Sequence, residues 1–415
     1  MQLIIAEIGT SHETSYEKAR ALIDTAADAG ADAVKFQWVY ADEILHPDTG
    51  TVNLPTGSIR LYDRFKSLEC GADFYADMLE YAHSRNILFG CSPFGLKSLS
   101  ELLEIKPDFV KIASPELNHY PMLKSLAAFR ENQKARGENA VPVILSSGVS
   151  RISDIEKALE ILGTDGVTLL HCITSYPAPE DEYNLRVISS LRAVFGVETG
   201  VSDHSSDPVL VPCLFVSQGG TVIEKHITLS RRTSGLDDPI ALEGEQFAIM
   251  CRALRQSFEA MRNYGKERGA YEIIERMNAV YGAEKVSSVL GDGIKRLADS
   301  ERENYGRTNR SIHFMRAMKK GERIKADDVA VLRTEKNSHT RHFTGVFGKR
   351  YRSAAYKRRN KRFGSKSFRF NRLNRNAYAK TLLSAKTFDR RYVKTAARKS
   401  IYSAVALSYE ILDFE

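Results

Sequence analysis

The stretch AVKFQ, residues 33–37, shows the pattern that decides the fold. It is a short apolar run that contains one lysine and ends in a polar residue. This is typical of a buried parallel strand whose carboxyl end carries polar side chains. A lysine inside such a strand is costly unless its ammonium group is paired, so Lys35 is a candidate functional residue.

Seven further runs repeat the pattern, each short, mostly apolar or β-branched, and followed by polar residues. With the first they make eight predicted strands, at Leu3–Glu7, Ala33–Gln37, Ile87–Cys91, Phe109–Ala113, Pro142–Ser146, Val167–Cys172, Val197–Val201 and Thr221–Lys225. Amphipathic segments predict helices between them, at Tyr16–Ala29, Ile155–Leu162, Leu185–Phe195 and Phe247–Met261. Eight strands alternating with helices over about 260 residues favour an α/β fold of the (β/α)₈ TIM-barrel type over a doubly wound sheet.

The sequence predicts four parts. Residues 1–264 form the barrel, 265–307 a charged connector, 308–350 a small β-rich module and 351–415 a basic tail of atypical composition. Within the module, residues 308–337 predict a strand, a Lys-Lys-Gly-Glu turn and a second strand.

The formal net charge of +8 belongs to the tail rather than to the body of the chain. Residues 341–415 hold 20 Lys+Arg and 4 Asp+Glu, which leaves a net charge of −8 on residues 1–340. A basic tail can bind nucleic acid or anionic surfaces. No recognised nucleic-acid motif occurs here, so nucleic acid is not an expected partner.

The sequence predicts a cytoplasmic protein without a membrane span. The start, MQLIIAEIGT, lacks both the basic region and the cleavage pattern of a signal peptide. No apolar run reaches the 18 or more residues that a membrane span requires. The five cysteines are scattered and form no CxxC pair, which favours reduced, buried thiols.

In a barrel, side chains at the carboxyl ends of the strands face the active site. Here these positions hold two lysines and several hydroxyl groups, which donate hydrogen bonds to anionic oxygens and suit a phosphate and a carboxylate. Glu7 is a candidate acid or base. A single strand-end serine is more often part of a turn, so the argument rests on the whole set.

Two histidines, His204 and His226, follow neighbouring strands and could share one divalent metal, with waters in its other positions. Imidazole with oxygen ligands suits Mn²⁺, with Mg²⁺ or Co²⁺ as alternatives. Each histidine alone could be a satisfied core residue, but at adjacent strand ends metal binding is the better hypothesis. His171, set back from its strand end, is expected to be structural.

The motifs AEIGTSH, VKFQ, SPF, KIASPELNHYPML, ILSSGVS, LLHCITSYPAP, VSDHS and VIEKHITLSR fall in this order over residues 6–231. As an ordered set they closely resemble the N-acetylneuraminate (sialic acid) synthase family. The sequence TEKN after Arg333 is similar to the branch of spore coat polysaccharide biosynthesis proteins. The resemblance implies that C3 of phosphoenolpyruvate attacks the open-chain aldehyde of N-acetylmannosamine or a related hexosamine. Water then adds to C2 and phosphate leaves, giving a nine-carbon sugar acid.

The resemblance also implies roles for matching residues. Glu7, Lys35 and Lys111 would be catalytic, and His204 and His226 would bind a metal that polarises the aldehyde. The phosphoenolpyruvate-binding set would comprise both lysines with Ser92, Ser114, Ser146 and Ser202. Positions near the sugar or the metal would be Gln37, Tyr176 and Asp237, and Thr174 and Glu116 also match motif positions. The family's antifreeze-like (SAF) domain implies that Arg333 reaches a partner's sugar site in a domain-swapped homodimer.

Three departures from the family pattern stand out. Thr174 replaces a frequent asparagine, and Asp238-Pro239 alters the loop after Asp237. The second half of the SAF domain is not recognisable after Asn337, although residues 347–350 resemble a remnant. The tail is then a diverged domain end, the product of a shifted reading frame, or a basic extension that binds an anionic partner.

Other functions remain open at this point. A pseudaminic or legionaminic acid synthase, or another phosphoenolpyruvate-dependent sugar-acid synthase, would use the same strand-end residues. An inactive barrel that binds carbohydrate is the non-enzyme alternative, but it has no need for lysines and a histidine pair there. The nucleotide-binding motifs GxGxxG and GxxxxGK[ST] are absent.

Overall fold

The structure is a computed structural model that describes residues 2–54, 57–233, 235–319 and 321–334. The chain divides into two compact units, residues 1–344 and 345–415, and all described residues lie in the first. The predicted tail and residues 335–350 of the predicted small module lie outside the described residues. The predicted domain boundaries therefore stay predictions.

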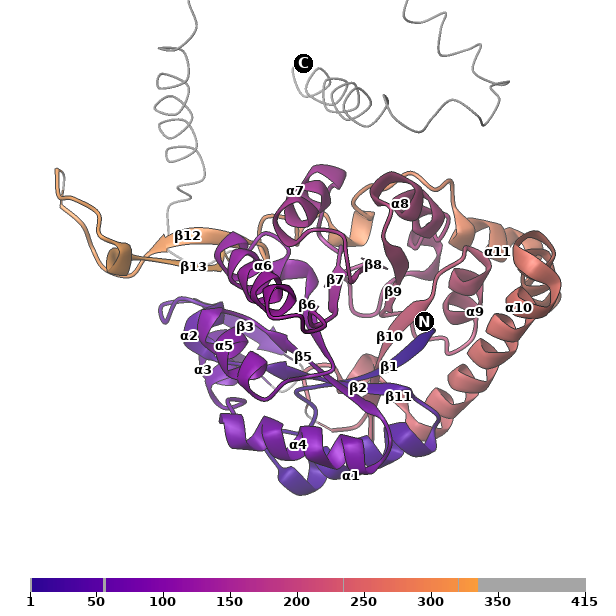
Figure 1. Cartoon of the computed structure of the whole chain (residues 1–415), viewed down its shortest axis with the longest axis horizontal. Helices are drawn as coiled ribbons and strands as arrows, with labels where there is room; N and C mark the ends of the chain where they lie inside the picture. The colour runs from indigo at the N-terminus through magenta and orange to yellow at the C-terminus, as the bar shows by residue number, and fades with distance from the viewer. Residues whose placement is uncertain (1, 55–56, 234, 320, 335–415) are drawn as a thin grey trace, which may run out of the picture. The chain divides into compact units, whose positions relative to one another are not determined.

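Eight parallel strands form a closed barrel (Figure 1). They pair in chain order, and the first pairs with the last, from Leu3 opposite Val222 to Glu7 opposite His226. The strands are β1 (Leu3–Gly9), β2 (Ala33–Trp38), β5 (Leu88–Pro93), β6 (Phe109–Ile112), β7 (Val143–Ser146), β8 (Val167–Cys172), β9 (Glu198–Asp203) and β10 (Val222–Thr228). Closure confirms the predicted barrel, because a doubly wound sheet keeps two open edges.

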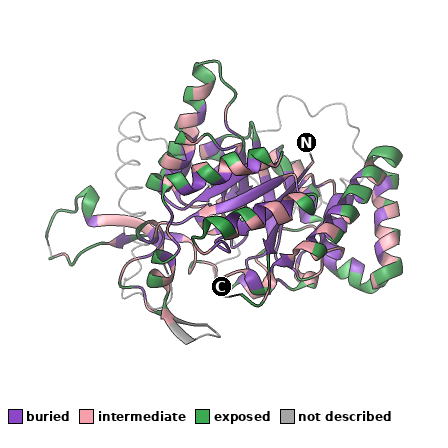
Figure 2. Cartoon of the chain, turned by 90° about the horizontal axis from the view of Figure 1, so that it is seen from below, coloured by how far each residue is buried: buried purple, intermediate pink, exposed green. Residues whose placement is uncertain are grey.

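Helices follow the strands and enclose the barrel, so that buried strands are surrounded by helices with exposed outer faces (Figure 2). They are α1 (Tyr16–Asp28), α2 (Ala41–Ile44), α3 (Leu61–Lys66), α4 (Ala72–Ser84), α5 (Leu96–Glu104), α6 (Tyr120–Ala135), α7 (Ile152–Leu162), α8 (Val187–Phe195), α9 (Leu210–Ser217), α10 (Gly244–Tyr281) and α11 (Ala283–Leu290). Short 3₁₀ turns occur at Ser114–Glu116, Glu180–Glu182, Asp238–Ile240, Asp299–Glu301 and Ala326–Asp328.

Two small strand pairs accompany the barrel. β3 (Thr51–Leu54) pairs with β4 (Gly57–Arg60) after β2, and the sequence did not indicate this hairpin. β12 (Arg310–Phe314) and β13 (Val329–Arg333) form the predicted antiparallel pair of the small module, with Arg310 opposite Arg333. A two-residue strand, β11 (Leu242–Glu243), extends the sheet beside β10.

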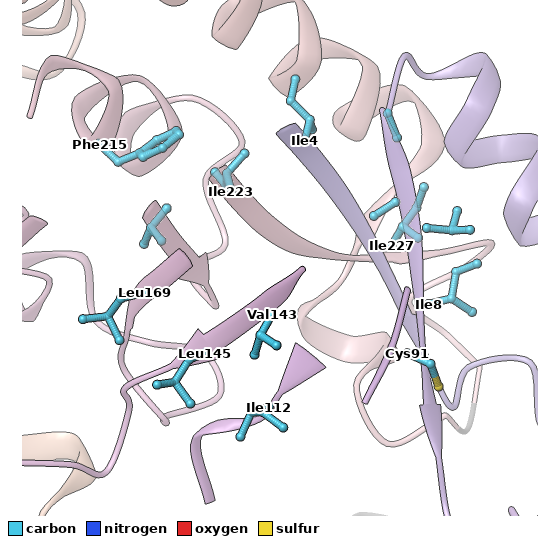
Figure 3. Packing of buried hydrophobic residues seen from close by; sticks show 14 of the residues in the cluster. Ile4, Ile8, Cys91, Ile112, Val143, Leu145, Leu169, Phe215, Ile223 and Ile227 are labelled. Carbon is cyan, nitrogen blue, oxygen red and sulfur yellow. The ribbon is translucent and has the colours of Figure 1, made fainter. Parts of the chain in front are cut away.

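The barrel has two apolar layers because side chains alternate between the faces of a strand. The outer faces pack against the helices, and Figure 3 shows Ile4 and Ile8 of β1 and Ile223 and Ile227 of β10 in this layer. The inner layer closes the amino-terminal end of the barrel like a floor; it comprises Leu3, Ile5, Ala33, Phe109, Ile144, Leu170 and Val222, with Leu88 packed against it.

Glycine makes room in this floor at two positions. A Cβ on Gly90 would lie 2.1 Å from the ring of Phe109, and a Cβ on Gly200 would lie 1.8 Å from the carbonyl oxygen of Val222. Neither contact is possible for real atoms, so both sites require glycine. The described residues of this floor are therefore densely packed, which favours entry of a ligand from the carboxyl ends of the strands.

The helices also follow from local sequence. α1 begins after Ser15, whose side chain accepts the backbone N–H of Lys18, and ends before Gly30, whose φ of +93° stops it as expected. α7 begins at Ile152, three residues before the predicted start, because the carboxylate of Asp154 accepts the N–H of Arg151. No described helix is long and apolar enough to cross a membrane, and all five cysteines are buried and free.

Candidate active site

Polar side chains stand two residues beyond the inner apolar layer on nearly every strand. Counting in steps of two from Ile5, Ala33 and Phe109 leads to Glu7, Lys35 and Lys111. The same step from the floor reaches Ser92, Ser146, Ser202, Glu224 and, two residues further, His226. Because inward-facing positions recur every two residues, a layer of buried polar side chains lies directly above the apolar floor.

The ammonium group of Lys35 lies at the centre of one half of this layer. It pairs with Glu7 at 2.6 Å and donates to Ser92 Oγ at 3.0 Å. The amide of Gln37 donates to the other carboxylate oxygen of Glu7 at 2.8 Å. The structure therefore brings together four of the predicted residues, from three adjacent strands.

Glu224 joins the two halves of the layer and was not among the predicted site residues. Its carboxylate lies 3.2 Å from Lys111 Nζ and 3.8 Å from Lys35 Nζ, and it accepts a hydrogen bond from Ser202 Oγ at 2.9 Å. The signal was present in the sequence, because Glu224 and His226 are two residues apart and so share a face. Lys225 between them points the other way and pairs with Asp203 at 2.6 Å.

Two lysines and two glutamates thus balance one another in a buried site. Burial raises the pKa of Glu224, but Lys111 and Lys35 outweigh it and lower this pKa to about 2. Burial lowers the pKa of Lys35, but Glu224 and Glu7 outweigh it, so this pKa is raised. For Lys111 burial prevails over the attraction of Glu224, and its pKa is lowered.

Ser146 and Ser114 lie on the neighbouring strand ends. Ser146 Oγ is buried without a hydrogen-bond partner among the described residues, so it is free to donate to a ligand. Ser114 Oγ accepts the N–H of Gly148 at 3.0 Å. A Cβ on Gly148 would lie 2.2 Å from Thr174 Oγ1 and 2.8 Å from Ser114 Oγ, so this glycine allows three loops to meet.

His204 and His226 face each other beside this layer, with ring centroids 5.6 Å apart. A ring centre lies about 3 Å from a metal bound through its nitrogen, so two rings on one ion would be about 4.5–6 Å apart. His204 Nδ1 contacts the carbonyl of Ile173 at 2.8 Å, which leaves Nε2 for another partner. The two imidazoles fit a shared ion, although the described residues contain no group of three or more His, Cys, Asp or Glu side chains arranged for one.

Tyr176 and Asp237 adjoin the histidine pair. The ring of Tyr176 lies 4.4 Å from that of His204, and Asp237 lies 3.9 Å from His226 Nδ1. The departure at Asp238 has a local structural role, because its buried carboxylate accepts hydrogen bonds from Thr228 and from the N–H of Gly235. It fixes the loop that presents Asp237.

Glu116 faces the C-terminal strand pair. Its Oε1 accepts from Arg310 at 2.9 Å and from Arg333 at 3.0 Å, and the Arg333 guanidinium stacks over the ring of Phe94 at 5.3 Å. Arg333 therefore reaches the barrel mouth within its own chain, and its predicted role in a partner's site stays a prediction. His171, which we expect to be structural, has its Nε2 at 2.6 Å from the carbonyl of Tyr183.

Comparison with known proteins identifies the family. Residues 22–266, more than half of the chain, match the NeuB family. The chain belongs to the NeuB family. This confirms the predicted resemblance and the predicted enzyme class, a phosphoenolpyruvate-dependent sugar-acid synthase.

Individual NeuB relatives resemble most of the chain. The spore coat polysaccharide biosynthesis protein SpsE of Bacillus subtilis is 32% identical over 335 residues, or 80% of this chain and 83% of SpsE. Its crystal structure matches with a TM-score of 0.65, covering 80% of this chain and 84% of that one. The N,N'-diacetyllegionaminic acid synthase of Campylobacter jejuni is 31% identical, covering 77% and 86%. A sialic acid synthetase structure from Leptospira borgpetersenii matches with a TM-score of 0.54 and 30% identity, covering 73% and 90%.

Proposed function

We propose that this NeuB-family enzyme condenses phosphoenolpyruvate with N-acetylmannosamine or a related 2-acetamido hexosamine to a nine-carbon sugar acid and releases phosphate. One observation carries the proposal: two buried lysines and the strand-end serines converge on one layer above a closed apolar floor. Ammonium and hydroxyl groups at this depth suit a ligand that is anionic at both ends, as phosphoenolpyruvate is.

The chain's own residues can be placed in the reaction. Lys35 and Lys111, with Ser92, Ser146 and Ser202, would bind and orient the phosphate and the carboxylate. Glu7 would hold or release a proton near the reacting carbons, since Lys35 and Gln37 fix its two oxygens. In the condensation, C3 of phosphoenolpyruvate bonds to the aldehyde carbon, water supplies the new oxygen at C2, and the C2–O bond to phosphate breaks.

We propose that His204 and His226 hold a divalent metal, Mn²⁺ before Mg²⁺ or Co²⁺. When bound, this ion would polarise the sugar aldehyde as a Lewis acid. Tyr176 and Asp237 adjoin the histidine pair and Gln37 bonds to Glu7, and these three would contact the sugar. Thr174, Ser114 and Glu116 would line the mouth of the site.

The acceptor sugar is the open part of the proposal. Relatives of similar identity are named as synthases of diacetyllegionaminic, pseudaminic and sialic acids. A legionaminic- or pseudaminic-type acceptor is therefore the second candidate.

A panel of 2-acetamido hexosamines tests the proposal and the choice of acceptor. We expect phosphate release from phosphoenolpyruvate only when a suitable sugar and a divalent metal are both present, with a product mass equal to sugar plus pyruvate. A Lys111→Met variant serves as the matched inactive control, since it keeps the length of the side chain but removes its charge. Absence of turnover with every sugar in the folded full-length protein would overturn the proposal.

We also propose that two copies form a homodimer that exchanges the β12–β13 hairpin. In such an exchange the hairpin keeps the same contacts but makes them with the barrel of the partner subunit instead of its own. The pair between Arg333 and Glu116 would then form between subunits instead of within one chain.

A further inference from the structure

The connector crosses the carboxyl ends of three consecutive barrel strands just before it enters the β12–β13 hairpin. We call residues 301–310 the strap. Its first residue, Glu301, ends the 3₁₀ turn at Asp299–Glu301, and its last, Arg310, begins β12. The side chains of the strap contact the loops that follow β6, β7 and β8, which carry predicted site residues.

Glu301 holds two of these loops with one carboxylate. Its Oε1 accepts the backbone N–H of Val149 at 2.6 Å and that of Thr174 at 2.9 Å, and Oε2 accepts the N–H of Ala298 at 3.2 Å. Glu301 is 1% exposed. A buried carboxylate needs such donors, and the two loop amides in turn would lack a partner without it.

Two asparagines of the strap bind the carbonyl groups of the same two loop residues. Asn309 Nδ2 donates to the carbonyl of Val149 at 3.2 Å, and Asn304 Nδ2 donates to that of Thr174 at 3.1 Å. Both backbone groups of each loop residue are therefore bonded to the strap. Val149 needs this support, because its φ of +42° is unfavourable for a β-branched residue.

The two loops serve different parts of the proposed site. Val149 follows Ser146, on the phosphoenolpyruvate side. Thr174 precedes Tyr176, whose ring lies 4.4 Å from that of His204 on the sugar side. A third loop, after β6, is bonded through Asn118, which exchanges two hydrogen bonds of 2.9 Å with the backbone of Arg310.

We propose that Glu301, Asn304 and Asn309 are positioning residues for this reaction. Asn309 holds the loop that aligns phosphoenolpyruvate, Asn304 holds the loop that aligns the sugar, and Glu301 holds both. In the part of the chain that the structure describes, their hydrogen bonds go to backbone groups and not to Glu7, Lys35 or Lys111, so they would act through the loops. The inference rests on the proposed function, because it assigns each loop to one substrate.

Steady-state kinetics with each substrate varied in turn tests the assignment. We expect Asn309→Ala to raise the KM for phosphoenolpyruvate about tenfold while changing the KM for the sugar little, and Asn304→Ala to do the reverse. Glu301→Ala should raise both, and Glu301→Gln should recover part of the loss because its carbonyl oxygen can still accept both loop amides. Arg302→Ala is the matched control, since this exposed strap residue forms its ion pair with Asp299, at 2.8 Å, and not with a loop that follows a strand. Equal changes in both KM values for the two asparagine variants would overturn the inference.

Hydrogen exchange of the protein without substrates separates this inference from the proposed function. We expect the amides of Val149 and Thr174 to exchange about tenfold faster in Glu301→Ala than in the wild type and in Arg302→Ala. Unchanged exchange would overturn the positioning role whatever the kinetics show. Faster exchange in an enzyme whose wild type turns over no sugar would support the strap's hold on the loops and overturn the proposed function instead.

Discussion

At the scale of single residues, the site is organised by buried charges that neutralise each other. Glu224 lies between two lysines, and removal of one member of such a set leaves another charge without a partner in a buried place. Removal of one of these charges should therefore affect more than catalysis. It should also lower the free energy of unfolding and change how that free energy depends on pH.

Glu224→Gln should make this visible. Because the folded pKa of Glu224 is lowered from 4.5 to about 2, its contribution to stability is present at neutral pH and is lost as pH falls through this range. We expect the variant to lose about 3 kcal/mol at pH 7, and its difference from the wild type to shrink as pH falls from about 5 to about 2. Urea unfolding at several pH values measures this, with the exposed Glu131→Gln as control. A difference that stays constant with pH would contradict it.

The histidine pair gives a second prediction at this scale. We expect His204→Ala and His226→Ala each to weaken Mn²⁺ binding by about a hundredfold, because each removes one of two imidazole ligands. Calorimetric titration of the protein without substrates measures the affinity directly. His83→Ala, on the outer helix α4, should bind Mn²⁺ as the wild type does. Normal binding by both site variants would show that the metal lies elsewhere.

The sequence predicts those site residues that stand at the ends of barrel strands. Lys35, Lys111, Ser202 and Glu7 stand at strand ends, so the strand pattern alone brings them together. Glu224 is hard to predict because it lies next to Lys225 and His226 in one charged run. The two-residue period of a strand shows that Glu224 and His226 point into the barrel and that Lys225 points outward. The contacts of Glu301 join residues 127 and 152 positions apart, which no local pattern indicates.

At the scale of elements, the sequence predicts the ends of the strands to within three residues and places the helices Tyr16–Asp28, Ile152–Leu162 and Val187–Phe195, but it does not predict the irregular connections. β9 and β10 run beyond their predicted ends to Asp203 and Thr228, because polar strand ends look like turns in a sequence. α10 passes through the predicted boundary at 264 and continues to Tyr281, with a kink at Gly265. The β3–β4 hairpin alternates polar and apolar residues only over Thr51–Leu54 and Ser58–Leu61, and runs of four residues are too short to predict strands.

The hairpin β12–β13 is joined to the barrel by a buried charge cluster. Glu116→Gln should cost about 3–5 kcal/mol, because it leaves the guanidinium groups of Arg310 and Arg333 without their carboxylate. Arg310→Met should cost less, since Glu116 keeps Arg333. Chemical unfolding measures both, and limited proteolysis after Arg316 reports release of the hairpin. A larger loss for Arg310→Met than for Glu116→Gln would contradict this ranking.

At the scale of the whole molecule, the barrel and the hairpin are coupled through Arg333, either within a chain or across a dimer. Both arrangements give the same contact with Glu116, so the contact alone does not distinguish them. The two arrangements differ in how many copies of the chain supply residues to one site: one copy without exchange, and two copies with it.

Mixing two inactive variants tests the exchange. We expect Lys111→Ala and Arg333→Ala, each with little activity alone, to recover activity when they are unfolded together and refolded. In a mixed dimer one barrel would keep Lys111 and receive an intact Arg333 from its partner. Phosphate release measures the recovery, and refolding each variant alone is the control. No recovery in a sample shown by light scattering to contain dimers would mean that each arginine serves its own barrel.

The apolar floor has a consequence for the order of events in the proposed reaction. Among the described residues the apolar floor fills the amino-terminal end of the barrel, and Lys35 and Lys111 are buried more deeply than Tyr176 and Arg333. A sugar bound at the mouth would block the route to the lysines. In the proposed reaction phosphoenolpyruvate would therefore bind before the sugar, and the phosphate at the lysines would leave after the sugar acid.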